Sequence, residues 1–432
     1  LFCACPSRTG RPPNTDVCPV CLGLPGALPV LNRTAVERAV ACALALGCRV
    51  NERSRFARKS YFYPDLPRGY QITQYEQPLA EGGALPLGAG ESRIGIERVH
   101  LEDDTGRSEH RADGVTLVDM NRAGVPLAEI VTAPELRSAD DAVAAVRTLR
   151  RILVHAGVSG ASLERGELRI DLNVSLAGGG DGARGERVEV KNLNSTAHLA
   201  AAIAHERRRQ AELLAAGRPV ERETRAWSET ARRTEPIRDK EAVSDYRYFP
   251  EPDLPPLEVG ADLVERVRFA LPEPPEGRRA RLERLGLDAD AARLLTETRA
   301  VADHFDAVLA GVGDPRRAAA FVVGTALPDA RRSGDRSAAP RVDAERVAEV
   351  LRMVERRELS FAAAREVYGA LAVGAASPAA AVAELGLALE DDPRAVERAC
   401  RRSIERNPEH ARRCRSGVAG LLGWFVGDAL RA

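Results

Sequence analysis

Four acidic residues in two strand-like segments are the first candidates for chemistry. Glu102, Asp103 and Asp104 end a segment of alternating apolar and polar residues, and Glu129 lies between apolar neighbours further along the chain. A carboxylate in an apolar run is costly to bury unless it is paired or bound to a metal ion. Carboxylates converging from separate strands suit Mg²⁺, which leaves positions for water and phosphate. The spacing leaves open a solvated acidic turn with a salt-bridged Glu129, and a lone His100 is more typical of a structural residue.

Four of the eight cysteines form two close pairs, Cys3-x-Cys5 and Cys18-x-x-Cys21. Two such pairs, separated by a gap rich in Pro, Gly and Asn, favour a closed tetrahedral zinc site over disulfides. A closed site of this kind would hold the fold and take no part in chemistry. Four unliganded thiols are the alternative. The isolated cysteines are expected to be buried structural thiols: Cys42, Cys48, Cys400 and Cys414.

Tyrosine and lysine are distributed unevenly. Six of the seven tyrosines lie in two Pro-punctuated stretches, residues 60–75 and 245–256, which favours a shaped, partly wet surface over core filling. Only Lys59, Lys191 and Lys240 are lysines, and all other cations are arginines. A retained lysine is a weak indication of a site that needs a point charge, such as a phosphate-binding site. The alternative is that these three lysines were retained by chance.

A polar strand face and a strand-to-helix junction complete the candidates. Asp171 and Asn173 lie two apart, on the face opposite Ile170 and Leu172, where a plain solvent-facing surface is the simpler interpretation. The tract Lys191–Asn194 lies where backbone N–H groups at a helix start can meet anions.

Local patterns predict the elements that carry these residues. Apolar spacing with start and stop signals predicts helices at 34–47, 138–157 and 196–216. Alternation predicts strands at 93–101, 115–118, 168–176 and 187–190, with a mobile hairpin connection at 178–182. Pro64, Pro67 and Pro78 suggest that residues 51–80 are irregular.

The whole chain fits a soluble protein with two or three domains. It has 432 residues, is 44% hydrophobic and 29% charged, and has a formal net charge of zero. No apolar run approaches about 18 residues, so no membrane span is expected. Zero net charge excludes a global field that attracts nucleic acid, and any such contact must be a local patch. From about Leu271 the helical spacing of Ala, Leu, Arg and Glu dominates, with a loop at 331–337 and a second junction near Ser377.

Several long and unusual motifs occur in the chain, at residues 18–26, 28–32, 61–75, 119–131, 189–195 and 245–256, and in the tail at 415–427. In these motifs the chain resembles the B subunit of the bacterial aspartyl/glutamyl-tRNA amidotransferases. The similarity runs in collinear order from Leu1 almost to Ala432. The resemblance implies an α+β fold: a cradle-like domain with a mainly antiparallel sheet and a zinc knuckle at 1–270. Two all-α modules follow at 271–376 and 377–432, and the last contacts tRNA.

The resemblance also implies a reaction, a C–N ligation with glutamine as amide donor. The side-chain carboxylate of a misacylated Glu-tRNA(Gln) or Asp-tRNA(Asn) is phosphorylated by ATP and then amidated. The ammonia comes through a channel from a partner A subunit, and a small C subunit completes a cytoplasmic heterotrimer. The implied cofactors are ATP, Mg²⁺ and structural Zn²⁺. The expected catalytic residues are Asp103, Glu129 and Lys191.

The resemblance and the motifs together predict which residues bind each metal ion and the substrates. The expected magnesium ligands are Glu102, Asp103 and Glu129, and the expected zinc ligands are Cys3, Cys5, Cys18 and Cys21. The residues expected to bind ATP or substrate are Lys59, Tyr61, Tyr63, Asp171, Asn173, Asn192 and Asn194.

Two departures from the family pattern affect these expectations. The family usually has Glu-Glu-Asp where this chain has Glu102-Asp103-Asp104, so the shorter Asp103 weakens its assignment as a ligand. The family's metal-binding histidine lies on a strand upstream of Leu1. We therefore expect the sequence to be a fragment that also lacks the last helix and is inactive alone.

Two other functions stay open at this point. One is a non-catalytic, zinc-containing RNA-binding adaptor that uses the Arg-rich helices at 206–209 and 398–402, although such arginines are usually a solvated face. The other is the archaeal-type E subunit, which acts on Glu-tRNA, but the chain has no room near Pro272 for the domain inserted there. The sequence does not indicate which misacylated tRNA is the substrate.

Overall fold

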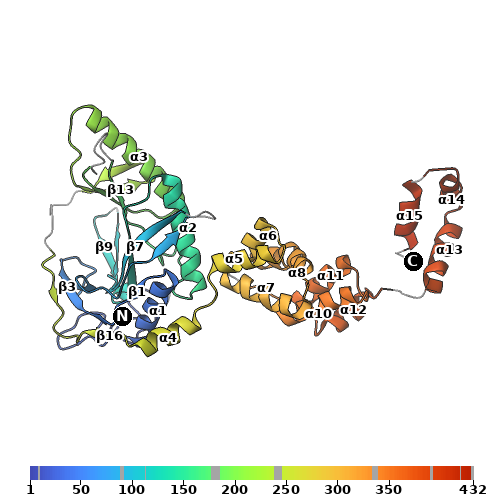
Figure 1. Cartoon of the computed structure of the whole chain (residues 1–432), viewed down its shortest axis with the longest axis horizontal. Helices are drawn as coiled ribbons and strands as arrows, with labels where there is room; N and C mark the ends of the chain where they lie inside the picture. The colour runs from blue at the N-terminus through green and yellow to red at the C-terminus, as the bar shows by residue number, and fades with distance from the viewer. Residues whose placement is uncertain are drawn as a thin grey trace. The chain divides into compact units, whose positions relative to one another are not determined.

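The computed structural model describes residues 1–7, 10–87, 92–111, 113–176, 185–237, 246–332, 339–389, 393–418 and 420–429. The chain divides into two compact units, Leu1–Gly277 and Arg278–Ala432. The first contains the strands and the second is helical (Figure 1), so the predicted α+β class is confirmed. The finer division at 270 and 376 stays a prediction.

An eight-stranded sheet built around one long strand forms the centre of the first unit. The long strand β7 (Arg93–Asp103) pairs with β4, β5, β6 and β10, and the strand pairs of this sheet are antiparallel. The other strands are β1 (Arg49–Val50), β3 (Phe56–Ser60), β4 (Tyr70–Gln74), β5 (Ala80–Glu81), β6 (Ala84–Pro86), β10 (Pro126–Thr132) and β15 (Phe249–Pro250). The expectation that residues 51–80 are irregular is therefore wrong, because the prolines lie between these short strands.

An irregularity in the β7–β10 pairing lets apolar residues before and after it share one face of β7. The register shifts between Val131 and Thr132, so that Val131 pairs with Arg98 but Thr132 pairs with Ile96. Such a bulge changes which side of the sheet successive side chains face. As a result Ile96 and Val99 are both buried in the same core cluster, and His100 and Glu102 fall on the opposite face.

Helices α1 (Arg33–Ala45) and α2 (Ala139–His155) lie beside this sheet (Figure 1) and complete its core. The Asn32 side chain accepts the N-terminal hydrogen bond of α1, so the predicted start at Thr34 is slightly late. Ser138 caps α2 as its sequence pattern predicts.

A smaller sheet with one helix forms a separate layer of the first unit. Its strands are β11 (Leu172–Val174), β12 (Val188–Lys191), β13 (Thr224–Ser228) and β14 (Arg233–Pro236), and its helix is α3 (Thr196–Ala215). The strand predicted at 168–176 is thus shorter than expected, and the hairpin connection predicted at 178–182 lies outside the described residues.

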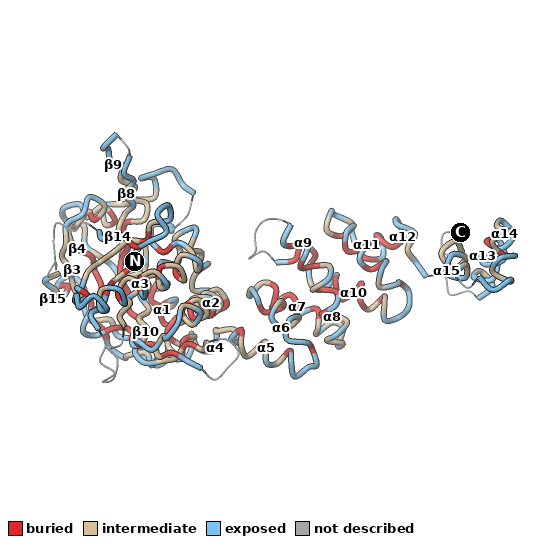
Figure 2. The backbone as a smooth tube through the Cα atoms, turned by 90° about the horizontal axis from the view of Figure 1, so that it is seen from above, coloured by how far each residue is buried: buried red, intermediate tan, exposed pale blue. Residues whose placement is uncertain are grey.

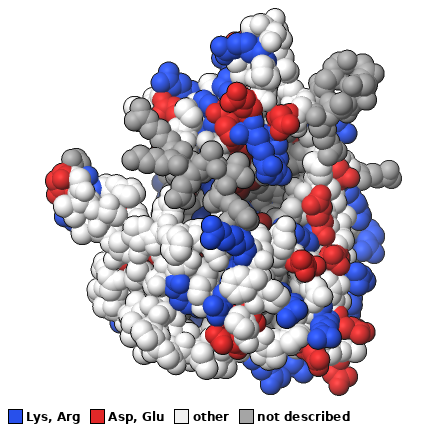
Figure 3. Space-filling model, turned by 90° about the vertical axis from the view of Figure 1, so that its left-hand side faces the viewer, with Lys and Arg blue, Asp and Glu red and all other residues white. Residues whose placement is uncertain are grey.

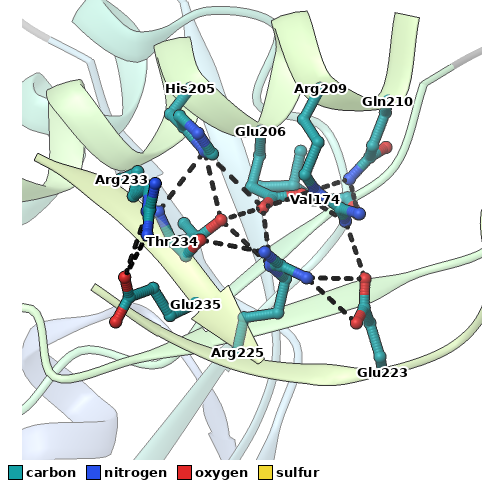
Figure 4. Close-up of polar contacts among 10 residues, drawn as sticks. All are labelled: Val174, His205, Glu206, Arg209, Gln210, Glu223, Arg225, Arg233, Thr234 and Glu235. Carbon is teal, nitrogen blue, oxygen red and sulfur yellow. Dashed lines mark hydrogen bonds and ion pairs between the residues drawn. The ribbon is translucent and has the colours of Figure 1, made fainter. Parts of the chain in front are cut away.

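A buried carboxylate joins α3 to this smaller sheet (Figure 4). Glu206 is fully buried and pairs with Arg209 at 2.9 Å and Arg225 at 3.3 Å, and Thr234 and Gln210 also donate to it. Its pKa is lowered because these hydrogen bonds outweigh the cost of burial. A buried charge with several partners is strongly destabilising to break, so this network fixes the helix on its strands.

The remaining elements of the first unit are small. They are β2 (Arg53–Ser54) with β16 (Leu257–Glu258), the hairpin β8 (Arg107–His110) and β9 (Thr116–Asp119), the 3₁₀ turn η1 (Met120–Arg122) and α4 (Ala261–Ala270). The β8–β9 hairpin is largely exposed (Figure 2).

The second unit consists of helices. They are α6 (Ala289–Leu295), α7 (Arg299–Val312), α8 (Pro315–Phe321), the π-turn η2 (Val322–Ala326), α9 (Leu327–Arg331), α10 (Ala344–Glu355), α11 (Phe361–Ala372), α12 (Pro378–Leu385), α13 (Pro393–Arg406), α14 (Pro408–Arg415) and α15 (Gly420–Ala429). Helix α5 (Pro275–Arg284) spans the boundary between the units. Most of the loop predicted at 331–337 lies outside the described residues.

Burial in the second unit follows helical spacing, and Phe305, Phe321 and Leu351 lie in one core. Two predictions of buried thiols are wrong there, because Cys400 is exposed and Cys414 is only partly buried. Both cysteines lie on short amphipathic helices with few buried residues. Among the described helices, none is both long and apolar enough to cross a membrane.

Candidate active site

Three side chains from β7 and β10 meet on one face of the central sheet. The register places Glu129 directly opposite His100, and Glu102 is two residues further along β7 on the same face. His100 Nε2 lies 3.6 Å from Glu129 Oε2 and 3.9 Å from Glu102 Oε2. One donor atom from each of the three residues could therefore contact a single metal ion.

The electrostatics of this cluster favour a neutral imidazole. His100 is 3% exposed, and burial, aided by Arg98 and Lys59, lowers its pKa to about 3. A neutral ring keeps a lone pair for a metal ion. Burial also raises the pKa of Glu102, whose carboxylate accepts a 3.0 Å hydrogen bond from Thr73. Because the side chain of Glu129 is 47% exposed, the cluster is open to solvent on one side.

The predicted role of Asp103 as a metal ligand requires correction. As the neighbour of Glu102 in a regular strand, Asp103 faces the opposite side of the sheet. There its carboxylate pairs with Arg68 and accepts a 2.7 Å hydrogen bond from the Ile72 backbone. His100 joins Glu102 and Glu129 instead, and the period-2 spacing of His100 and Glu102 is the signal in the sequence that could have identified it.

Asp104, the third residue of the acidic run, is a structural link. It is 5% exposed and pairs with Arg122 at 2.6 Å and Arg169 at 2.8 Å. The first pair ties the end of β7 to η1, and the second ties it to the segment that precedes β11. Of the three residues in the acidic run, Glu102 belongs to the cluster, and Asp103 and Asp104 form ion pairs that support the end of β7.

The two aromatic stretches meet beside the cluster. The Lys59 ammonium lies 4.9 Å from the Tyr246 ring centroid and 5.9 Å from that of Tyr61. Tyr248 stacks on Tyr75 at 4.0 Å. Burial, Tyr246 and Glu102 raise the pKa of Tyr248 to about 12, so its phenol stays neutral near the carboxylates. Tyr246 and Tyr248 were not among the predicted site residues, although the clustering of tyrosines in the sequence pointed to their segment.

The other two residues expected from these stretches lie differently. Tyr61 donates to the Gln71 side chain at 3.2 Å. Tyr63 is 63% exposed and meets the Tyr61 ring edge to face at 6.4 Å. Tyr61 therefore lies next to Lys59, and Tyr63 contacts Tyr61 from the solvent side. Lys240 lies outside the described residues.

The predicted site residues of the smaller sheet form a second group. Lys191 at the end of β12 lies 3.8 Å from Glu189, and both Lys191 and Lys59 act electrostatically on Asp171. Asn173 is exposed on β11. Among the described residues, this group interacts with Lys59 and is not part of the cluster of His100.

The two asparagines after β12 shape the turn into α3. Asn192 has a φ of 66°, in the left-handed region, and donates to the Trp227 carbonyl at 3.1 Å. Asn194 donates to Asn192 at 3.3 Å. These amides support the start of the helix, and their predicted contact with ATP or substrate stays a prediction.

The four N-terminal cysteines converge as their spacing predicts. One sulfur from each lies within 4.8 Å of the others, and Cys21 Sγ is 3.4 Å from Cys3 and 3.5 Å from Cys18. Backbone and side-chain hydrogen bonds lower the pKa of Cys18 to about 7, against the effect of burial, while burial raises that of Cys5 to about 11. Four close thiols, one of them readily ionised, match the donor set of a zinc site.

One face of the molecule carries both signs of charge. On the face shown in Figure 3, acidic and basic side chains are interspersed, and the described residues form no single continuous basic patch there. This agrees with the formal net charge of zero.

Comparison with known proteins places the chain in a family. The family model described as "GatB/GatE catalytic domain" matches residues 1–265, and the one described as "GatB domain" matches residues 303–432. Similar relatives, named as B subunits of aspartyl/glutamyl-tRNA(Asn/Gln) amidotransferase, include those of Anaeromyxobacter sp. (strain K), 46% identical, Nitratidesulfovibrio vulgaris (strain DP4), 44%, and Myxococcus xanthus (strain DK1622), 42%. Each alignment covers 100% of this chain and 91% of the relative. The chain therefore belongs to the GatB family, that of the B subunits of the aspartyl/glutamyl-tRNA(Asn/Gln) amidotransferases.

Proposed function

We propose that this chain activates the side-chain carboxylate of a glutamate or aspartate attached to the wrong tRNA. A carboxylate oxygen of the substrate attacks the γ-phosphorus of ATP and ADP leaves. Ammonia then attacks the carbonyl carbon of the acyl phosphate and phosphate leaves. The observation that carries this proposal is the cluster of His100, Glu102 and Glu129 in the domain that the family model describes as catalytic.

The residues of the cluster fit a divalent cation. Two carboxylates suit Mg²⁺, and one imidazole makes Mn²⁺ an equally good occupant. The buried Glu102 and the neutral His100 would hold the ion from the sheet, and Glu129 would hold it from the open side. A bound cation supplies positive charge that offsets the negative charge of the phosphoryl group during transfer.

The lysine beside the cluster would orient the phosphate. The Lys59 ammonium is held next to two tyrosine rings, where it offers a point charge near Glu102. Lys191 would play the corresponding part on the smaller sheet, near Asp171.

The implied partners and location complete the proposal. The ammonia would come from an amidase A subunit, with a small C subunit in the same complex, in the cytoplasm, where misacylated tRNA is available. The four cysteines would bind one structural zinc ion. The relatives' names include both Asn and Gln tRNAs, so either misacylated tRNA fits.

Both alternatives are less well supported. An RNA-binding adaptor does not need a buried His–Glu pair completed by an exposed Glu129. The archaeal-type E subunit shares the first family model, but residues 303–432 match the model described as a GatB domain, and the relatives named above are B subunits.

Glu129→Gln in the assembled complex tests the proposed role. Loss of a group that only supports a metal ligand typically costs 10- to 100-fold, so loss of a direct ligand should lower ADP formation on misacylated tRNA by at least about 100-fold. Binding of the tRNA should be unchanged. Glu97→Gln is the matched control, because Glu97 is an exposed carboxylate on β7 outside the cluster. Normal ADP formation by the Glu129 variant would exclude this site as the seat of activation.

A further inference from the structure

The second aromatic stretch is attached to the central sheet as an added edge strand. β15 pairs with β3, placing Phe249 opposite Arg58 and Pro250 opposite Ala57. Beyond the strand on both sides, the Ser60 backbone donates to the Tyr246 carbonyl and the Glu251 backbone donates to the Phe56 carbonyl, each at 2.9 Å. A two-residue strand with a proline makes few ladder bonds, so pairing alone holds it weakly.

A buried ion pair reinforces this edge. Arg58 donates from Nε to Glu251 at 2.8 Å and from Nη2 at 2.9 Å, which is a two-point contact. The Glu251 side chain is fully buried, and Arg58 also lies over the Tyr70 ring at 4.1 Å. Glu251 additionally accepts from the backbone of Asp253, so it fixes its own segment as well as β3. Two-point arginine–carboxylate contacts set direction as well as distance.

Arg58 and Lys59 are neighbours in β3, so their side chains leave opposite faces of the sheet. Glu251 binds Arg58 on one face. On the other face Lys59 lies against the Tyr246 ring, which belongs to the same segment as Glu251. Glu251 therefore links Arg58 to the segment that carries Tyr246, together with the Arg58–Asp253 ion pair at 3.1 Å and the Ser60–Tyr246 backbone hydrogen bond.

We propose that Glu251 is a positioning residue, which holds Tyr246 against Lys59 and so aims the lysine at the carboxylate cluster through its pair with Arg58. The effect of Glu251 on the reaction rests on the proposed function, in which Lys59 orients phosphate. The effect of Glu251 on the surroundings of Lys59 is independent of that function, because it concerns only how two aromatic rings enclose one amine.

Amine labelling of Glu251→Gln in the assembled complex tests this inference. The chain has three lysines, so mass spectrometry can follow the acylation rate of each one. Lys59 should be acylated about 5-fold faster in the variant, the factor that corresponds to losing one cation–π contact of about 1 kcal/mol. Lys191, whose side chain is 47% exposed, should keep its rate and serve as the internal reference.

Two further variants separate positioning from general loosening. Asp329→Asn removes another buried carboxylate that pairs with an arginine, the half-exposed Arg341 of the helical unit, and should leave the Lys59 rate unchanged. Arg58→Lys keeps the positive charge but loses the two-point contact, so it should give an intermediate rise and is available if the Glu251 variant does not fold. An unchanged Lys59 rate, or equal rises at Lys59 and Lys191, would overturn the inference.

The activity of the same complex completes the test. Glu251→Gln should raise KM for ATP about 5-fold, by the same loss of one contact, and change kcat less. Faster labelling without a change in KM would overturn the role of Glu251 in the reaction. Failure of the proposed function is distinguishable, because it would appear as absence of ATP turnover in the unaltered complex.

Discussion

At the scale of single residues, the direction of each side chain decides its role. Glu102 and Asp103 are adjacent in the sequence, yet one faces the cluster and the other pairs with Arg68 on the opposite side of β7. The acidic run and Glu129 could be selected from the sequence because carboxylates in apolar surroundings are costly. The period-2 spacing put His100 on the same face as Glu102, but its position opposite Glu129 depends on the register of the two strands, which the sequence does not show.

His304 gives a pH dependence that can be measured apart from the active site. Burial lowers its pKa to about 4, against the pull of Asp343, so the folded state holds it neutral. The unfolded chain takes up this proton near pH 6.5. The stability it confers is therefore complete above that pH and falls by about 3 kcal/mol as the pH drops toward 4.

Hydrogen exchange of core amides in α7 and α10 of the full chain can follow this loss. Wild type should lose protection between pH 6.5 and 4 after correction for intrinsic exchange, and His304→Gln should lose less over the same range. Equal losses in the two proteins would show that His304 does not titrate as burial requires.

At the scale of elements, the sequence predicted long strands and capped helices, but it did not predict short strands or the contacts that anchor loops. The long alternation of β7 and the capped helix α2 were predictable from period and end signals. Residues 51–80 were not, because strands of two to five residues between prolines carry too little pattern. Pairing with distant strands makes them strands: β4 and β5 pair with β7, β3 pairs with β4 and β15, and β2 pairs with β16. The cysteine loop is similar: contacts of Asn14 and Asp16 with residues 118–121 anchor it.

Removal of zinc should therefore destabilise the parts of the first unit that contact the cysteine loop as well as the loop itself. Chelation, or Cys21→Ser, should lower the midpoint of thermal unfolding of the first unit by about 5 °C, which corresponds to ~2 kcal/mol for a unit of this size. Cys400→Ser is the control, because that thiol is exposed and distant in sequence from the quartet. One zinc per chain is expected by elemental analysis, and a chain that contains none and is unaffected by chelators would contradict the proposed zinc site.

At the scale of the whole molecule, the sequence indicated the class and the family better than the details of the site. Helical spacing after Leu271 predicted the all-helical second unit, because a helix repeats its pattern over many residues. Long motifs supplied the family resemblance, which the two family models and the relatives confirm. The contacts of Lys59 with Tyr246 and of Arg58 with Glu251 join residues almost two hundred positions apart, so no local sequence pattern predicts them.

Pulsed electron paramagnetic resonance of the chain with one equivalent of Mn²⁺ can detect the proposed metal ligands themselves. A cation shared by His100, Glu102 and Glu129 predicts a nitrogen-14 coupling from a directly bound imidazole. The coupling should disappear in His100→Gln and persist in Glu97→Gln. Absence of nitrogen coupling in the unaltered chain, or its survival without His100, would contradict the claim that these three residues hold the metal ion.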